Sequence, residues 1–201
     1  TGMGLERITA VIQGKLSNYD TDLFTPLLAA IGERLPPESG RHRVHRGTMD
    51  PVDVSMRVVA DHMRAMTFLI ADGVVPSNEW RGYVLRKIMR RAMRHGKRLG
   101  IAQPFLHALV DTLVREFGAA YPELTRGRDT VVQVIRSEEE RFDAVLTDGL
   151  PRLEEALDRA AASDKILAGD VACRLYDTFG LPRDFIEDMV EERKLTPDRE
   201  G

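Results

Sequence analysis

The sequence predicts an all-α protein, a helical bundle of about seven to eight helices that includes one long helix. Apolar side chains recur at three- and four-residue intervals through most of the chain, as on one face of an amphipathic helix. No segment shows the period-two alternation of a half-buried strand, and there is no internal repeat. Hydrophobic residues make up 43% and charged residues 30% of the 201 residues, which supports a packed core and argues against wholesale disorder.

Simple counts exclude several classes of protein. The single cysteine excludes a disulfide framework and any multi-cysteine zinc site, and we expect no metal site. No apolar run approaches the roughly 18–20 residues that a membrane span needs. With 10 prolines and 16 glycines the chain is not collagen-like or linker-like. Because the chain begins with threonine instead of methionine, we expect it to be an excised piece of a longer protein.

Capping residues, proline and glycine predict where the first helices start and stop. Residues 5–13 suit a short helix after a glycine-rich start, and the acidic segment 20–22 offers an N-cap for a second helix that reaches residue 31. The stretch 36–53 has no periodicity and is expected to be a loop. Apolar residues return at helical spacing over 54–70, which predicts a third helix.

The next predicted helix is strongly basic. It follows a turn in which Ser77 or Asn78 can act as N-cap, and it ends at Gly96 or Gly100. Between residues 81 and 98 there are eight Lys or Arg and no acid, so the net charge of −3 hides about −11 on the rest of the chain. We expect these side chains to form a continuous cationic ridge on an apolar-backed helix. The eight cations are Arg81, Arg86, Lys87, Arg90, Arg91, Arg94, Lys97 and Arg98.

The C-terminal half is also expected to be helical. A long amphipathic helix is predicted over 128–147, with the glutamates at 138–140 pointing outward. Gly149 and Pro151 are expected to kink or break this helix. The remaining predicted segments are a helix over 104–117, a helix over 153–161, a short helix over 170–176 and, after a turn at 180–182, a last helix to about Arg193.

The cationic ridge has two interpretations, which both stay open. Phosphate contacts supply most of the non-specific affinity for nucleic acid, and Trp80 and Tyr83 at the start of the helix could stack or pack. Alternatively, the ridge is a solvated helix face that pairs with the three glutamates at 138–140. These interpretations correspond to a stand-alone helical RNA-binding module and to a helical scaffold whose basic and acidic helices pair internally.

Two smaller groups of residues could also carry chemistry. Gly2 and Gly4 would let the backbone approach a ligand closely, and Arg7 could face a phosphate, although a flexible terminus explains the same residues. Asp177, expected after a helix end and beside a glycine turn, could accept a hydrogen bond from a base-edge amine or simply make a turn hydrogen bond. Cys173 is interpreted as a small hydrophobic residue in a helix.

Six blocks of sequence, spread in order over nearly the whole chain, carry a resemblance to one family. They are T-G-M-G-L-E-R at 1–7, S-N-Y-D-T-D-L-F at 17–24, R-V-V-A-D-H-M-R at 57–64, the stretch 70–76, R-G-Y-V-L-R-K-I-M-R-R-A at 81–92 and R-L-Y-D-T-F-G-L-P at 174–182. The first block resembles the third signature motif of class II aminoacyl-tRNA synthetases. Together the blocks resemble the alanyl-tRNA synthetases, and their spacing argues against a stand-alone RNA-binding module.

The resemblance implies a cytoplasmic enzyme that joins alanine to tRNA(Ala) with ATP, through an alanyl-adenylate. Residues 1–35 would be the C-terminal end of the catalytic domain, 36–53 a linker and 54–201 a helical domain that recognises the tRNA acceptor stem. ATP and Mg²⁺ would belong to the intact enzyme and not be retained by this piece, which lacks the first two class motifs and should be inactive alone. The implied partners are the tRNA(Ala) acceptor stem and the rest of the catalytic, editing and C-terminal domains, with no DNA and no membrane.

The resemblance also implies roles for the N-terminal motif. Arg7 would contact ATP as a catalytic residue. Gly2 and Gly4 would let the backbone lie close to the nucleotide, and Glu6 would help to orient the site. A positive side chain at this place stabilises the charge that develops on the leaving pyrophosphate.

A second implied site reads a G·U wobble pair near the end of the acceptor stem. Asp177 would accept a hydrogen bond from the guanine amine, which the wide minor groove of RNA leaves accessible. The family companion of this residue is an asparagine just before the R-G-Y block, where this chain has Trp80, so Asn78 serves instead or Trp80 stacks or covers the groove. The implied stem contacts are Arg91, with Arg81, Arg86 and Arg90 on phosphates.

Overall fold

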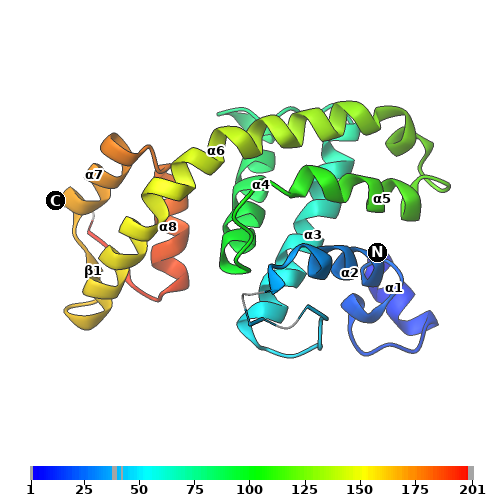
Figure 1. The fold of residues 1–201 in the computed structure, drawn as a ribbon, viewed down its shortest axis with the longest axis horizontal. Coiled ribbons are helices and arrows are strands. Elements are labelled where there is room, and N and C mark those ends of the chain that lie inside the picture. The colour runs from blue at the N-terminus through cyan, green and yellow to red at the C-terminus, as the bar shows by residue number, and fades with distance from the viewer. Residues whose placement is uncertain (1, 38–39, 42, 199–201) are drawn as a thin grey trace. The chain divides into compact units, whose positions relative to one another are not determined.

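A computed structural model describes residues 2–37, 40–41 and 43–198. The chain forms two compact units, Thr1–Glu139 and Glu140–Gly201, each considered by itself below. The described residues contain eight α-helices, two 3-10 helices and one short parallel pairing of two-residue strands (Figure 1). The prediction of an all-α fold with one long helix is therefore confirmed. None of the helices in this part of the chain combines the length and apolar character that a bilayer crossing requires.

In the first unit, α3 and α4 pack against each other at the centre of the core. Met56, Val59 and Met63 of α3 and Leu85 and Met89 of α4 are fully buried, and their spacing places each set on one helix face. The elements of this unit are α1 (Leu5–Ile12), η1 (Asn18–Asp20), α2 (Thr25–Arg34), α3 (Pro51–Ala71), α4 (Trp80–Arg98), η3 (Leu106–Leu109), α5 (Val110–Phe117) and the first part of α6 (Pro122–Ala162).

The loop before α3 is anchored by a buried carboxylate. Asp53 is fully buried and accepts hydrogen bonds from the backbone nitrogens of Arg46, at 3.0 Å, and Thr48, at 2.7 Å. Helix α3 starts at Pro51, earlier than predicted, because the Asp50 side chain caps it by accepting from the nitrogen of Val52 at 2.8 Å. The loop thus lies within the first compact unit, and the two compact units divide after Glu139, inside α6.

The long helix α6 is not broken. It runs from Pro122 to Ala162 with Pro151 inside it, so of the kink or break expected at Gly149 and Pro151, the break is wrong. The buried leucines on either side of the proline, among them Leu150 and Leu153, keep the helix packed through this turn. Gly149 has a packing role, because a Cβ at this position would lie 2.7 Å from the Cγ atom of Leu181.

The second unit contains the rest of α6, α7 (Gly169–Phe179), α8 (Arg183–Glu192) and the paired strands β1 (Ile166–Leu167) and β2 (Thr196–Pro197). Helix α7 ends at Phe179, and its C-cap Gly180 has a φ of 69°, in the left-handed region that glycine adopts readily. The backbone nitrogen of Leu181 then bonds to the Leu175 oxygen at 3.2 Å, and the Leu181 side chain is fully buried. The predicted helix end at residue 176 is therefore three residues too early.

Two glycines of α6 provide a matched test of this packing. Gly149→Ala and Gly127→Ala bring the same gain in helix propensity, about 1 kcal/mol, but nothing lies within 4 Å of a Cβ at Gly127. We expect Gly127→Ala to raise the free energy of unfolding. The free energy of unfolding of Gly149→Ala should be about 1–3 kcal/mol lower than that of Gly127→Ala, because the added methyl group overpacks against Leu181. Urea unfolding measures both. Equal effects would show that Leu181 moves aside without cost.

Candidate nucleic-acid interface

The loop before α4 and the first turn of α4 enclose a surface hollow of about 420 Å³. The loop is held tightly against the helix, because a Cβ at buried Gly82 would overlap the Val75 carbonyl oxygen and the Ser77 hydroxyl. The Ser77 hydroxyl also donates to the Glu79 carbonyl oxygen at 2.8 Å. The loop therefore has a defined shape, which it needs if it is to present side chains to a ligand.

Arg86, a residue of α4, contacts both this loop and α6. Its guanidinium group donates to the side-chain oxygen of Asn78 and, at 3.3 Å, to the carbonyl oxygen of Pro76. Its Nε atom lies 3.0 Å from Oε1 of Glu138, and the Nε atom of Arg90 lies 3.7 Å from the same oxygen. Glu138 is only 4% exposed, and a buried carboxylate requires such positive partners.

The prediction that the glutamates at 138–140 all point outward is wrong. Glu138 and Glu139 are buried and only Glu140 is exposed. Glu139 accepts hydrogen bonds from the backbone nitrogens of Phe105 and Leu106 at 2.8 and 2.7 Å. The internal pairing of the basic and acidic helices is thus present, but it involves the inner side of α4.

The eight cations of α4 do not form a continuous ridge. Arg94 is only 2% exposed, and only Arg81 and Arg91 of the eight are classed as exposed. Burial, followed by the charge of Arg94, lowers the pKa of His95 to about 3, so this histidine is neutral at physiological pH. The predicted phosphate contacts of Arg86 and Arg90 would compete with Glu138, whereas Arg81 and Arg91 are open to a ligand.

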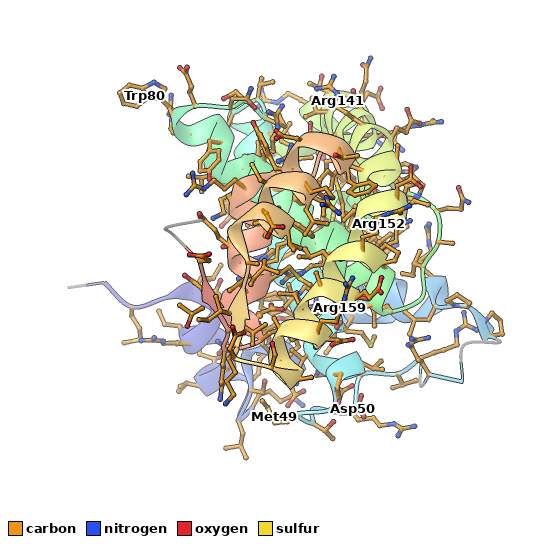
Figure 2. The ribbon with its side chains drawn as sticks, turned by 90° about the vertical axis from the view of Figure 1, so that its left-hand side faces the viewer. Met49, Asp50, Trp80, Arg141, Arg152 and Arg159 are labelled. Atoms are coloured by element: carbon orange, nitrogen blue, oxygen red, sulfur yellow. The ribbon has the colours of Figure 1, made fainter. Side chains whose placement is uncertain are left out.

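Trp80, the first residue of α4, is exposed and conformationally strained. Its side chain is 88% exposed and projects from the ribbon in Figure 2, and its φ is 52°. A left-handed conformation costs about 1–2 kcal/mol for a residue with a Cβ atom. Helical spacing places Val84, which is 55% exposed, and then Lys87 and Arg91 on the same side of α4 as Trp80. We call Trp80, Val84, Lys87 and Arg91 the α4 stripe.

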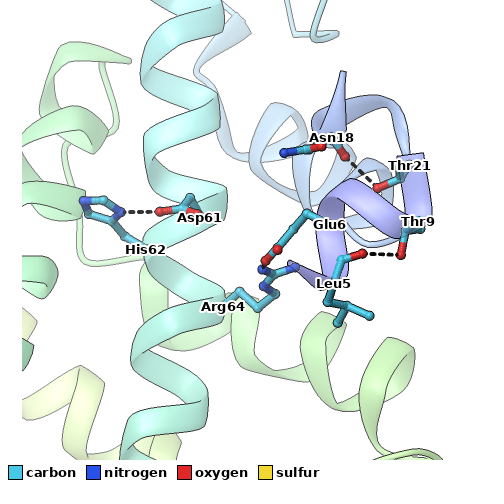
Figure 3. Close-up of polar contacts among 8 residues, drawn as sticks. All are labelled: Leu5, Glu6, Thr9, Asn18, Thr21, Asp61, His62 and Arg64. Carbon is cyan, nitrogen blue, oxygen red and sulfur yellow. Dashed lines mark hydrogen bonds and ion pairs between the residues drawn. The ribbon is translucent and has the colours of Figure 1, made fainter. Parts of the chain in front are cut away.

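The N-terminal motif is only partly accessible. Thr1 lies outside the described residues, and Gly2 and Gly4 are exposed just before α1. Glu6 forms an ion pair with Arg64 of α3 (Figure 3), whose guanidinium carbon lies 4.5 Å from the centre of the Phe24 ring.

The ion pair shows that Glu6 holds α1 against α3. Arg7 is exposed and lines a hollow of about 520 Å³ together with Gly4, Glu6, Asp61 and three uncharged residues. No group of three or more His, Cys, Asp or Glu in the described part of the chain is arranged to hold a metal ion.

Asp177 lies in the last turn of α7, in the second unit, and not after the helix end as expected. Its carboxylate is exposed and accepts a weak hydrogen bond from the thiol of Cys173 at 3.7 Å. Cys173 is exposed, so its interpretation as a small hydrophobic residue is wrong. The predicted stem contacts Asn78, Trp80, Arg81, Arg86, Arg90 and Arg91 all belong to the first unit.

The structure adds three residues that pattern reasoning did not single out as site residues. Glu138 orients Arg86, Glu139 holds the start of η3, and Arg64 fixes Glu6. The available signals were weak: the glutamates occur in a charge run, which is usually solvated, and Arg64 lies on a helix with a mostly apolar face.

The strain at Trp80 predicts an inverted ranking of two substitutions. Inside a helix, alanine is normally more stable than glycine by about 1 kcal/mol. At Trp80 we expect the Gly variant to unfold at a higher temperature than the Ala variant, because glycine adopts the positive φ without strain. The same two substitutions at Val84, which is exposed in the same helix, should show the normal ranking. A normal ranking at both positions would mean that φ at residue 80 is not strained.

Comparison with known proteins places this chain in a family. All 201 residues match the family of tRNA synthetases class II (A). Curated relatives named "Alanine--tRNA ligase" include those of Magnetococcus marinus, 50% identical, and of Rhizorhabdus wittichii and Acidithiobacillus ferridurans, each 51% identical. Each alignment covers the whole of this chain and 22% of the relative, so the chain spans about a fifth of the length of these proteins. The chain therefore belongs to the class II (A) tRNA synthetases.

Proposed function

We propose that this chain is the part of an alanine–tRNA ligase that binds the tRNA acceptor stem, and that the intact protein joins alanine to tRNA(Ala) with ATP. The names of the relatives support the reaction, and the sequence blocks at 81–92 and 174–182 support the role of this part. The observation that carries the proposal is the α4 stripe, because a strained, exposed tryptophan on the same helix face as the exposed Arg91 is explained better by RNA binding than by folding.

The α4 stripe and the adjacent Arg81 offer two kinds of contact to an RNA stem. Arg81 and Arg91 supply charge for phosphates, which provides salt-sensitive and sequence-independent affinity. Trp80 supplies a flat apolar surface that can lie against a base or a ribose. Arg86 and Arg90 are committed to Glu138, so we assign the phosphate contacts mainly to Arg81 and Arg91.

Discrimination of the G·U pair is assigned to Asp177 and Asn78. The exposed carboxylate of Asp177 can accept the guanine amine, which has no pairing partner in a wobble pair. Asn78 provides a second polar group in the loop before α4 and takes the role that the resemblance had left open between this residue and Trp80. Both are exposed, as a residue that reads a groove must be.

Residues 1–35 are proposed to form the end of the catalytic domain. Arg7 is exposed next to Gly4 and can contact a phosphate of ATP, which activates alanine in the reaction. Glu6 is bound to Arg64 and so positions α1 instead of contacting the nucleotide. The acids near Arg7 do not form a cluster that fits Mg²⁺, and we derive no step through the metal.

A helical scaffold is the second candidate function, because Glu138 does pair with Arg86 and Arg90. The two functions differ in one measurement. An acceptor-stem hairpin of tRNA(Ala), titrated with this chain at several salt concentrations, should bind with an affinity that falls steeply as salt rises. No binding at low salt would favour the scaffold.

Arg91→Ala should weaken binding to every stem and reduce the salt slope of log Kd by about one unit, because one phosphate contact is lost. Arg115→Ala is the matched control, since it removes an exposed arginine of α5 that is paired with Glu116. The control should leave the slope unchanged. Equal effects of the two variants would indicate general electrostatics and not a contact on α4.

Asp177→Ala should reduce the preference for a G·U stem over a G·C stem by about tenfold, the value of one base-edge hydrogen bond. The salt slope should stay the same, because no phosphate contact is lost. Asp148→Ala removes an exposed carboxylate of the second unit and should keep the preference. If Asp177→Ala weakened binding to both stems equally, Asp177 would not read the pair.

A further inference from the structure

We propose that Arg86 is a positioning residue, which turns the side-chain amide of Asn78 so that its NH₂ group faces the RNA. This inference rests on the proposed function, because it concerns how the same site selects its base pair. The family resemblance assigns Arg86 to a phosphate contact. We propose that the same side chain instead orients Asn78.

The first step is the chemistry of the amide. An asparagine side chain has one acceptor oxygen and one NH₂ donor, and rotation by 180° exchanges them with little change in shape. An arginine can only donate hydrogen bonds, so its contact with the Asn78 oxygen fixes which end faces it. Because Asn78 is exposed, the NH₂ group is then the end presented to a ligand.

The second step is that Arg86 is itself held in place. Its side chain is 13% exposed, donates a hydrogen bond to the carbonyl oxygen of Pro76 at 3.3 Å and forms an ion pair with Glu138, whose Oε1 lies 3.0 Å from the Nε atom of Arg86. Glu138 belongs to α6 and is 4% exposed, so its position does not depend on solvent or on the loop. The planar fork of an arginine can serve several acceptors in different directions, which the single ammonium group of a lysine cannot do with the same geometry.

The third step is what a fixed NH₂ donor selects. In the minor groove every base pair presents acceptors, namely pyrimidine O2 and purine N3, whereas guanine adds an amine donor. A donor held at Asn78 binds such an acceptor and is repelled by an amine. Because uracil is displaced in a wobble pair, its O2 atom does not lie where the O2 atom of a paired cytosine lies, so a donor in a fixed position distinguishes the two stems. The ligand class is therefore a minor-groove acceptor of an RNA stem, bound by the fixed donor at Asn78.

The test combines Arg86→Lys with Asn78→Ala and uses hairpin stems that carry a G·U or a G·C pair. Lysine keeps the positive charge near Glu138 but does not reproduce the fork on Asn78. We expect Arg86→Lys and Asn78→Ala to reduce the preference for the G·U stem by a similar factor, about tenfold, and the double variant to reduce it no further. Arg115→Lys, which changes an exposed arginine of α5 in the same way and lies outside the proposed interface, should keep the preference.

A measurement without RNA reports on the orientation directly. The side-chain amide NMR signal of Asn78, identified by its loss in Asn78→Ala, should shift in Arg86→Lys and stay in place in Arg115→Lys. If Arg86→Lys does not fold, Glu138→Gln serves instead, because it keeps the shape of the side chain and removes the charge that holds Arg86.

The outcomes separate the inference from the function on which it rests. Loss of preference in Asn78→Ala, with a normal preference in Arg86→Lys or additive effects in the double variant, overturns the positioning role. An unchanged Asn78 signal in Arg86→Lys overturns it as well. An unchanged preference in both Asn78→Ala and Asp177→Ala instead overturns the proposed reading of the base pair.

Discussion

Two neighbouring carboxylates of α6, those of Glu138 and Glu139, are almost completely buried, and the arrangement of the first unit depends on them. Successive residues of a helix point about 100° apart, so one turn of α6 directs Glu138 to α4 and Glu139 to η3. Glu139 accepts from three consecutive backbone nitrogens, those of residues 105–107. These N–H groups at a helix start have no partner within the helix, and a carboxylate from a distant helix satisfies them.

The same constraint divides the charges of α4 between two roles. Breaking a buried ion pair by removing one partner typically costs about 3–5 kcal/mol, so Arg86 and Arg90 are needed where Glu138 is. Arg91, one residue beyond Arg90, is turned away from Glu138 by the helix and is exposed. Folding thus accounts for the inner arginines of α4 and leaves the outer ones for a ligand, which reconciles the two interpretations of the basic helix.

The sequence pattern predicted most helices, because amphipathic spacing and capping act locally, but it failed where a distant residue decides. Helix α2 begins after Phe24 and not at the acidic segment 20–22, since Asp20 belongs to η1. Gly149 was read as a helix breaker, although its partner Leu181 is 32 positions away in the chain and explains the glycine by packing. Glu138 was expected in solvent because its buried partners cannot be recognised from neighbouring residues. Of the candidate site, the residue types were predictable, and the pairing of Arg86 with Glu138 belongs to one of the two interpretations that the sequence left open. The ion pair of Glu6 with Arg64, 58 positions away in the chain, could not be predicted from the pattern.

Two positions of the same turn show how folding and function place different demands on the start of α4. Gly82 has to be a glycine because the backbone of Val75 and the side chain of Ser77 occupy the space of a Cβ. Trp80 has a positive φ that suits glycine, yet it carries a large indole that is 88% exposed and gains almost nothing from burial. A residue that is unfavourable for both its backbone and its exposure persists when the surrounding structure enforces it and a ligand uses it. The contacts of Ser77, Gly82 and Arg86 hold the loop in place and so enforce this conformation, and the RNA stem that we propose as ligand would use the exposed indole.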